Sequence, residues 1–182
     1  MRYPHVFEVA SGVGTWNDAS ARMSDGASFE EFFATHIDPL LRVLAVITGS
    51  RTEAEDIAQE AFTRVFQRWE RVREMENPAG YLERTAMNVF RSQYRRATMA
   101  VRRTIGTAPE QDAFGAIEDR DVATRALAIL SPRQRAAVVL TEGLGYSGDE
   151  TARLLGIKSS TVWALTHQAR GALAKARGEA DG

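Results

Sequence analysis

The feature that most constrains the fold is a helix that stops and restarts near the end of the chain. Ser147 is followed three residues later by Glu150, a capping box in which each side chain caps the other's backbone amide. Gly156 stands where a left-handed residue ends a short helix. Ser159 or Ser160 is then expected to cap a second helix. This pattern predicts a helix-turn-helix, a unit that often places its second helix in a DNA groove. A purely structural helical hairpin is the alternative.

Helical signals also fill the first half of the chain. Apolar residues recur at helical spacing over residues 28–49. Thr52 and Glu55 predict a second capping box, and the helix that it opens is expected to bury both Phe66 and Trp69 on one apolar stripe. An Asn-Pro pair then opens a third helix, because proline at the first helical position has no amide to lose. These three helices are expected to bury one small core.

The fold is therefore predicted to be all-α, with two small helical domains joined by a flexible linker. No strand pattern of any length appears in the sequence. Short helices are expected over residues 121–130 and from Ser131, ahead of the helix-turn-helix. The expected segments are a flexible leader at 1–27, a three- or four-helix domain at 28–97, an acidic linker at 98–120, the helix-turn-helix domain at 121–178 and a tail at 179–182.

Composition excludes several classes of function. The 182-residue chain has no cysteine, which rules out disulfides and thiolate metal sites and favours a reducing cytoplasm. It has neither an apolar run of the ~20 residues that a membrane helix needs nor a secretory signal. The three histidines lie in no metal-ligand spacing, and glycine-rich phosphate loops and nucleophile elbows are absent. We therefore expect neither an enzyme nor a cofactor.

Charge is segregated along the chain, although the net charge is only −1. Residues 84–103 contain six arginines and no acidic residue, together with Asn88 and Tyr94. Arginines mixed with an amide and aromatic rings favour contact with phosphates and bases over a merely solvated face. Asp56 and Glu60, four residues apart, could act as metal-binding carboxylates, but a solvated face is favoured because no Glu-x-x-His partner accompanies them.

Together these residues resemble a bacterial RNA polymerase sigma factor of the extracytoplasmic-function (ECF) type, in the sigma-70 family. The resemblance covers about residues 28–178. Residues 54–62, AEDIAQEAF, resemble the family's "AEDLVQEtF" helix, and residues 77–88 resemble its "P-x-x-W-L-x-x-I-A-x-N" segment, with Tyr81 in place of tryptophan and Thr85 in place of isoleucine. The second half resembles the family's promoter-reading region in LSPRQR at 130–135, GYS at 145–147, LGI at 155–157 and TV at 161–162.

The resemblance implies a non-catalytic subunit that brings core RNA polymerase to promoters and helps to open them. One helix would bind the largest polymerase subunits through Asp56, Gln59, Glu60 and Thr63. The −10 element would be bound by Arg73, Asn77, Arg84, Asn88, Arg91, Arg95 and Arg96, with the loop at 71–77 as the pocket for a flipped base. The −35 element would be bound by Arg153, Lys158, Ser160, Thr161, Trp163, Ala164, His167, Gln168 and Arg170.

The second helix of the helix-turn-helix departs from the family pattern. Related sigma factors typically run "TVKSRLHRAR", whereas this chain has TVWALTHQAR from Thr161. The buried stripe is then either Val162, Thr166, Ala169 and Leu173, or the same set with Leu165 replacing Thr166. The exposed Trp163 is expected to contact DNA or another protein.

Two other readings stay open from the sequence. One is a sigma-derived regulator whose atypical helix binds a protein instead of −35 DNA, and the other is a free-standing helix-turn-helix repressor. Expected partners are core RNA polymerase and promoter DNA, with an anti-sigma factor or an activator as a further partner that the family allows.

Overall fold

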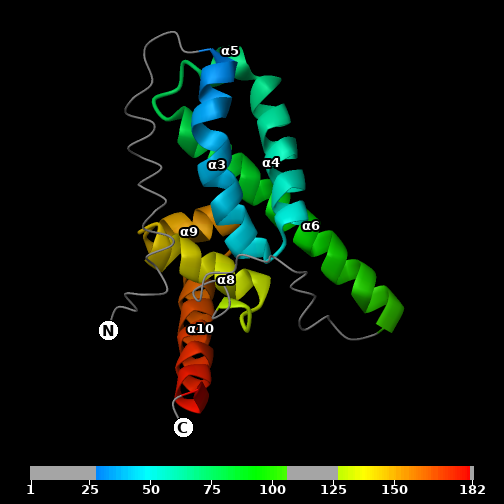
Figure 1. Ribbon diagram of the computed structural model, residues 1–182, viewed down its shortest axis with the longest axis vertical. Helices are drawn as coiled ribbons and strands as arrows, with labels where there is room; N and C mark the ends of the chain where they lie inside the picture. Colours follow the sequence, from blue (N-terminus) through cyan, green and yellow to red (C-terminus); the bar gives the residue numbers. More distant parts are fainter. Residues whose placement is uncertain (1–27, 106–126, 181–182) are drawn as a thin grey trace. The chain divides into compact units, whose positions relative to one another are not determined.

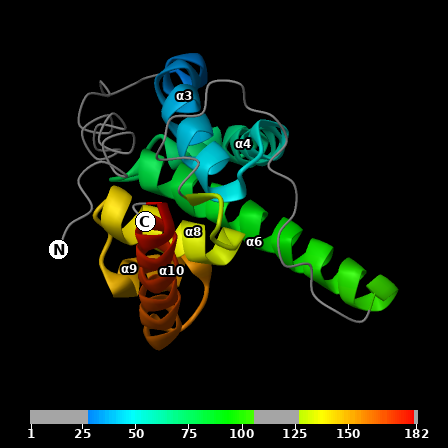
Figure 2. The ribbon, with the colours of Figure 1, turned by 60° about the horizontal axis from the view of Figure 1, so that its bottom comes forward.

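The computed structural model of the chain describes residues 28–105 and 127–180, and every regular element in these two ranges is helical. The predicted all-α fold is confirmed. Figures 1 and 2 show the elements from two directions. They are α3 (Phe29–Thr48), α4 (Arg51–Phe66), α5 (Trp69–Val72), α6 (Pro78–Ile105), α8 (Pro132–Val138), the π-helical turn η1 (Val139–Gly143), α9 (Gly148–Leu155) and α10 (Ser159–Ala180).

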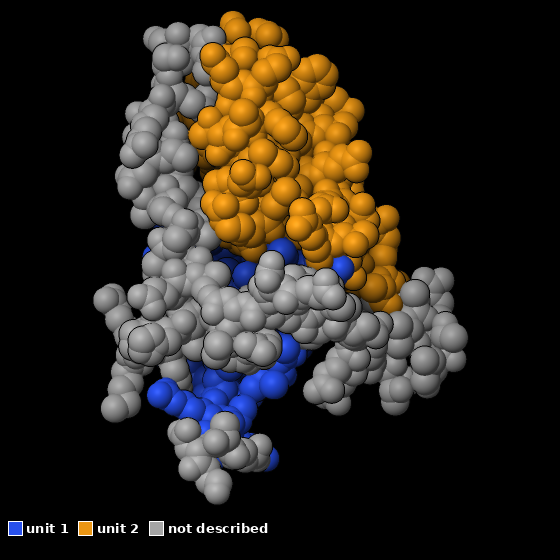
Figure 3. Space-filling view, in the orientation of Figure 1, with its two compact units in different colours: residues 1–12, 45–50, 110–182 blue, residues 13–44, 51–109 orange. Residues whose placement is uncertain are grey.

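The chain divides into two compact units, coloured separately in Figure 3. Of the described residues, 28–44 and 51–105 form the N-terminal unit, and 45–50 and 127–180 form the C-terminal unit. None of the described helices is both long and apolar enough to cross a membrane.

The core of the N-terminal unit lies between α3, α4 and α6. Ser28 and Glu31 cap the start of α3 reciprocally, since each backbone amide donates to the other's side chain at 3.1–3.2 Å. Helix α4 packs against α6 and crosses it at an angle, as both Figure 1 and Figure 2 show. The fully buried side chains include Phe32, Leu40 and Leu44 of α3, Ile57 and Val65 of α4, and Leu82 and Val89 of α6.

Two details of α4 differ from the sequence prediction. The helix begins at Arg51, so Thr52 lies inside it, and Glu55 accepts a hydrogen bond from Arg51 Nε at 2.8 Å instead of forming a capping box. Helix α4 also ends at Phe66, which is 59% exposed, whereas Trp69 is buried at the start of α5. The intervening turn tightens to a three-residue hydrogen bond, from the amide of residue 68 to the carbonyl of residue 65. Regular helical spacing accounts for the difference: Trp69 follows the buried Val65 by four residues and stays on the buried stripe, whereas Phe66 lies at the exposed edge of that stripe.

Helix α6 is longer than predicted. It starts at Pro78, as expected, but continues to Ile105, past the expected boundary at residue 97. The remainder of the expected linker, residues 106–120, lies outside the described residues.

The C-terminal unit is built from α8, η1, α9 and α10. Ser131 and Gln134 form a capping box at the start of α8, directly before Pro132. Most of the helix expected over residues 121–130 lies outside the described residues, although Leu127 and Leu130 are buried. The core of the unit includes Ala136, Val138, Leu140, Leu155, Val162 and Ala169.

Helix α3 carries a buried histidine, His36, in the core of the N-terminal unit. The Nδ1 of His36 lies 2.8 Å from the carbonyl oxygen of Phe32, which can only accept, so Nδ1 carries the proton. The other ring nitrogen, Nε2, has no hydrogen-bond partner among the described residues. The ring stacks on Phe32 at 4.3 Å between centroids. Burial lowers the pKa of His36 below its ordinary value of 6.5, because the charged ring would lose its hydration.

We expect the free energy of unfolding to fall as pH drops below about 6.5, since the unfolded chain then binds a proton that the folded His36 resists. The contribution of the neutral His36 to the free energy of unfolding is complete above that pH. It is lost as pH falls towards the lowered pKa that His36 has in the folded chain. Urea unfolding at about pH 7.5 and pH 5 should show a smaller pH effect in His36→Gln than in the wild type. His167→Gln, which changes an exposed ring, is the control. Identical pH effects in wild type and His36→Gln would contradict the assignment.

Candidate nucleic-acid and partner interfaces

The helix-turn-helix forms as the sequence predicts. Ser147 Oγ accepts from the amide of Glu150 at 3.2 Å, and Glu150 Oε2 accepts from the amide of Ser147 at 2.8 Å. The Ser147 hydroxyl also donates to Glu150 Oε2 at 2.6 Å, and this bond, followed by that from the Ser147 amide, holds the pKa of the Glu150 carboxyl below its usual range. Gly156 adopts a left-handed conformation, with φ of 59°, and ends α9. The capping box and the glycine stop are both confirmed.

The start of α10 is held differently from the prediction. Ser159 is already helical, and its hydroxyl donates to Asp149 Oδ1 of α9 at 2.5 Å. The carbonyl of Lys158 accepts from the amides of Thr161 and Val162, so Lys158 stands at the cap position that we expected for a serine. The Asp149–Ser159 bond ties the two helices of the motif together. Nothing in the sequence marks this pair, because the residues are ten positions apart and lie on different helices.

The buried stripe of α10 includes Thr166 and excludes Leu165. Val162, Thr166, Ala169 and Leu173 are all at least nine-tenths buried, whereas Leu165 is half-buried. The Thr166 hydroxyl donates back to the helix, with the carbonyl oxygens of Val162 and Trp163 at 3.0 and 2.9 Å. Because its polar atom is satisfied locally, threonine can take a core position here.

The opposite side of α10 presents an aromatic pair. Trp163 is 69% exposed, and its ring stacks on that of His167 with 5.3 Å between centroids and 9° between planes. Residues three and four apart share a helix face, so this pair lies on one side of α10. Ser160 and Gln168 are also exposed, and Thr161 and Ala164 are partly exposed.

Few formal charges accompany this surface. Arg153 and Lys158 are exposed beside it, at the end of α9 and in the turn. The Nε of Arg170 lies 2.7 Å from Glu142 Oε1, an ion pair in which the carboxylate is mostly buried. The π-helical turn η1 positions Glu142 for this contact. The stretch of α10 from residue 160 to residue 168 thus contains no lysine, arginine or acidic residue, and Arg170, one of the expected phosphate contacts, is already paired.

Helix α6 aligns four of the predicted −10 residues. Arg84, Asn88, Arg91 and Arg95 follow the spacing i, i+4, i+7 and i+11, which places them along one exposed stripe. Arg91 Nη1 donates to Asn88 Oδ1 at 3.1 Å, which orients that amide. We call these four residues the arginine stripe.

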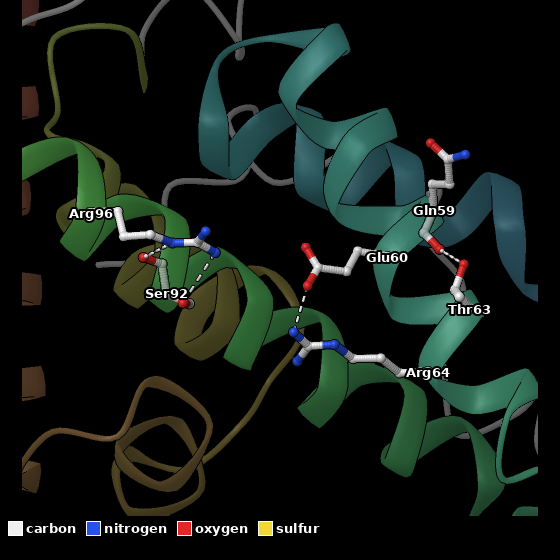
Figure 4. Close-up of polar contacts among 6 residues, drawn as sticks. All are labelled: Gln59, Glu60, Thr63, Arg64, Ser92 and Arg96. Carbon is white, nitrogen blue, oxygen red and sulfur yellow. Dashed lines mark hydrogen bonds and ion pairs between the residues drawn. The ribbon is translucent and has the colours of Figure 1, made fainter.

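Three other predicted −10 residues lie off the arginine stripe. Arg96 folds back onto its own helix, where it donates to the carbonyl oxygen and hydroxyl of Ser92 at 3.4 and 3.3 Å (Figure 4). Arg73 pairs with Glu70 at 3.4 Å. Asn77 caps α6, since its Oδ1 accepts from the amide of Gly80 at 2.7 Å.

The predicted polymerase-binding residues of α4 divide between two sides of the helix. Figure 4 shows Gln59 and Thr63 together, with the Thr63 hydroxyl donating to the Gln59 carbonyl at 2.7 Å. Glu60 lies on another side, in an ion pair with Arg64. Asp56 is exposed and has no ion pair in the part of the chain that the structure describes. Asp56 therefore gives this surface a negative charge that is not neutralised by an ion pair among the described residues.

Comparison with known families assigns both halves of the chain. Residues 32–99 match the family described as "Sigma-70 region 2", and residues 120–173 match "Sigma-70, region 4". An RNA polymerase sigma-E factor of Streptomyces coelicolor is 32% identical over 149 residues, which are 81% of this chain and 84% of that protein. The ECF RNA polymerase sigma factor SigL of Mycobacterium tuberculosis is 30% identical over 85% of this chain and 92% of its own length.

Solved structures share the fold. The sigma factor RpoE of Bartonella quintana, in complex with the anti-sigma factor NepR, has a TM-score of 0.60 and 22% identity, covering 81% of this chain and 94% of that one. CnrH, in complex with the cytosolic domain of CnrY, has a TM-score of 0.52 and 20% identity, covering 96% of this chain and 99% of that one.

Two substitutions separate the capping role of Asn77 from its predicted DNA contact. Asn77→Ala removes the cap and should lower the free energy of unfolding by about 1 kcal/mol. Asn77→Asp keeps an acceptor for the Gly80 amide and should retain that stability, yet it places a negative charge where DNA contact is expected. Chemical unfolding and promoter binding should be measured for both variants. A fully stable Asn77→Ala would show that the cap contributes nothing.

Proposed function

The chain belongs to the extracytoplasmic-function group of the sigma-70 family of RNA polymerase sigma factors, and on that premise we propose that it directs core RNA polymerase to a set of promoters and assists their opening. Sigma factors are transcription initiation factors and not enzymes. The observation that carries the proposal is the pairing, in one chain, of an arginine stripe on α6 with a helix-turn-helix in a second unit. Family membership favours this function over the regulator and the repressor.

The arginine stripe is suited to the −10 element. Eleven residues separate its ends, which corresponds to about 16 Å along the helix axis. Three guanidinium groups at this spacing can contact successive phosphates, while Asn88, oriented by Arg91, can reach a base edge. Arg96 can join them by exchanging its contacts with Ser92 for a phosphate. The loop expected at 71–77 begins only at Arg73, because Arg71 and Val72 belong to α5, and this loop at 73–77 would then receive the flipped base.

The helix-turn-helix is suited to the −35 element, with Arg153, Lys158 and Arg170 as phosphate contacts. Its exposed surface offers hydroxyls at Ser160 and Thr161, an amide at Gln168 and a methyl group at Ala164, all of which can read base edges. The stacked rings of Trp163 and His167 add an apolar area that suits thymine methyl groups and sugars. Because this surface of α10 carries few charges, we expect weak electrostatic anchoring to DNA. Recognition then depends on the shape of its side chains, so we also expect an unusual sequence preference.

Helix α4 is proposed to bind the largest polymerase subunits through Asp56, Gln59, Glu60 and Thr63. Asp56 supplies an open carboxylate for a basic partner side chain, and Gln59 supplies an amide. Glu60 is paired with Arg64 in the isolated chain, so its contribution requires exchange of that partner.

We further propose a cytoplasmic location and regulation by an anti-sigma factor. One of the similar solved structures is a sigma factor in complex with an anti-sigma factor, and another is CnrH in complex with the cytosolic domain of CnrY. An activator protein that binds the exposed Trp163 would act on the C-terminal unit.

Run-off transcription with purified core polymerase tests the function directly. The wild type should give specific transcripts, and Arg91→Ala should reduce open-complex formation. The same change should lower the salt dependence of promoter binding by a slope of about 1, because one phosphate contact is lost. Arg51→Ala is the matched control, since Arg51 is exposed and paired with Glu55 away from the stripe. A wild type that gives no specific transcript at low salt would refute the proposal.

Trp163→Lys should change promoter choice. The substitution replaces an apolar surface with a charge, so binding to non-specific DNA should rise and the salt slope should steepen by about 1. Trp163→Phe keeps an aromatic ring and should preserve most of the preference. Competition among a pool of −35 sequences, read by sequencing of the bound fraction, measures the outcome. Unchanged selectivity in Trp163→Lys would exclude this residue from DNA recognition.

A further inference from the structure

An exposed hydrogen bond joins the residue before α5 to the first turn of α6. The Nη1 of Arg68 donates to the hydroxyl oxygen of Tyr81 at 3.2 Å. Arg68 stands directly before α5, and Tyr81 lies in the first turn of α6, where its amide donates to the carbonyl of Asn77. The bond therefore connects the two helices that flank the loop at 73–77. We call the two residues the Arg68–Tyr81 pair.

The pair depends on a position at which this chain departs from the family pattern. Tyr81 stands where that pattern has a tryptophan. An indole nitrogen can only donate a hydrogen bond, whereas a phenolic oxygen can accept one and still donate its own proton. A tryptophan at position 81 could therefore not accept the hydrogen bond from Arg68.

Arg68 is oriented by a neutral partner and so keeps its positive charge. Its side chain is exposed, and it forms no ion pair with any residue that the structure describes. By contrast, the neighbouring Arg73 is paired with Glu70 at 3.4 Å. The contact with Tyr81 uses one of the five N–H donors of the guanidinium and neutralises none of its charge. The pair therefore offers an oriented cation and a hydroxyl proton to an anion.

The Arg68–Tyr81 pair lies beside the loop that is proposed to hold a flipped base. Helix α5 has only four residues and is about 6 Å long, so Arg68 is one turn away from the start of the loop at 73–77. Along α6, Tyr81 precedes Arg84 by three residues and Asn88 by seven, which places it on the same side of the helix as the arginine stripe. A strand that follows the stripe towards the loop therefore passes the pair.

The loop itself repels phosphate groups. It contains two exposed carboxylates, Glu74 and Glu76. Its own arginine, Arg73, is already paired with Glu70. A DNA strand that enters the loop therefore needs another positive charge nearby. Arg68 supplies that charge from the far end of α5.

We propose that the Arg68–Tyr81 pair binds a phosphate group of the non-template DNA strand, next to the base that the loop at 73–77 holds. This inference rests on the proposed function and adds a contact to it. The guanidinium of Arg68 donates to one phosphate oxygen, and the hydroxyl of Tyr81 donates its proton to another. Tyr81 also fixes the position of the Arg68 charge. The pair holds the backbone in register and carries no sequence information of its own.

A strand phosphate suits the pair better than a free anion does. Arg68 is exposed and Tyr81 is partly exposed, so a small anion would stay largely hydrated between them. A strand already bound along the arginine stripe presents its next phosphates at a high local concentration. The second contact then costs little additional entropy, because the strand is already held by the first.

Uncharged phosphate analogues test the contact directly. Full-length protein is bound to core polymerase and then to a single-stranded −10 oligonucleotide in which one phosphate at a time is replaced by a methylphosphonate. We expect one position, next to the flipped base, to weaken wild-type binding by about tenfold, the loss of a charge-assisted hydrogen bond. The same replacement should leave the binding of Arg68→Ala unchanged. A scan in which no position distinguishes the two proteins would overturn the inference.

Salt dependence and a double-mutant cycle give a second readout. Arg68→Ala should lower the slope of log affinity against log salt concentration by about 0.7, the value for one phosphate on a single strand. Arg68→Lys keeps the charge and should recover most of that slope. Tyr81→Phe removes only the hydroxyl, and most of its effect should disappear in the Arg68→Ala background. Fully additive losses would overturn the role of Tyr81 in positioning Arg68.

Arg42→Ala is the matched control. Arg42 is exposed on α3, in the same unit and outside the loop at 73–77. Its substitution removes the same charge and should leave both the methylphosphonate profile and the salt slope of the wild type unchanged. An equal loss of slope in Arg42→Ala and Arg68→Ala would reveal a general charge effect and overturn the site. Thermal unfolding checks that every variant is folded.

Failure of the site and failure of the proposed function give different results. A wild type that does not bind the oligonucleotide together with core polymerase would refute the proposed function itself. Equal binding by wild type and Arg68→Ala would overturn only the phosphate contact. A flat methylphosphonate scan, with calorimetric binding of inorganic phosphate to the wild type and not to Arg68→Ala, would assign the pair to a free anion in place of DNA.

Discussion

The packing of α4 against α6 determines where both functional surfaces of the N-terminal unit lie. Ala58 and Ala61 of α4 and Ala86 of α6 are fully buried, and side chains this small allow helices to pack closely. Once these faces are buried, helical geometry leaves Gln59 and Thr63 exposed on one helix and the arginine stripe exposed on the other. The surfaces proposed to bind polymerase and DNA are thus the outer sides of one interior contact, and a shift in that contact would move both.

In the C-terminal unit, the start of α10 lacks the basic residues that are typical of the family at these positions. Stability there comes from local capping and from the Asp149–Ser159 link between α9 and α10. Thr166 satisfies its hydroxyl within α10, which keeps the usual buried stripe despite the missing leucine. The helix can therefore present Trp163 without any change in how it packs.

Local signals in the sequence predicted much of this structure. The capping box at Ser147, the stop at Gly156 and the start of α6 at Pro78 depend on neighbouring residues, so a linear pattern reveals them. The all-α class followed from the same signals. The arginine stripe was visible as a run of arginines, although only helical geometry shows that Arg96 lies off it.

What the sequence missed depends on contacts between distant residues or on the width of a buried stripe. Phe66 and Trp69 were both expected in the core, but only Trp69 is buried, because Phe66 lies at the exposed edge of the stripe. The pairing of Arg170 with Glu142 needed the π-helical turn, which no pattern predicted.

The tight fit at the start of α6 has an evolutionary consequence. A Cβ added at Gly80 would lie 2.8 Å from the side-chain amide nitrogen of Asn77, closer than such atoms approach in real structures. Any side chain at position 80 therefore demands a different residue or rotamer at position 77, so the two sites form an epistatic pair. A rotamer change at Asn77 would break the hydrogen bond from the Gly80 amide to Asn77 Oδ1, so a substitution at position 80 is expected to remove the cap that starts α6.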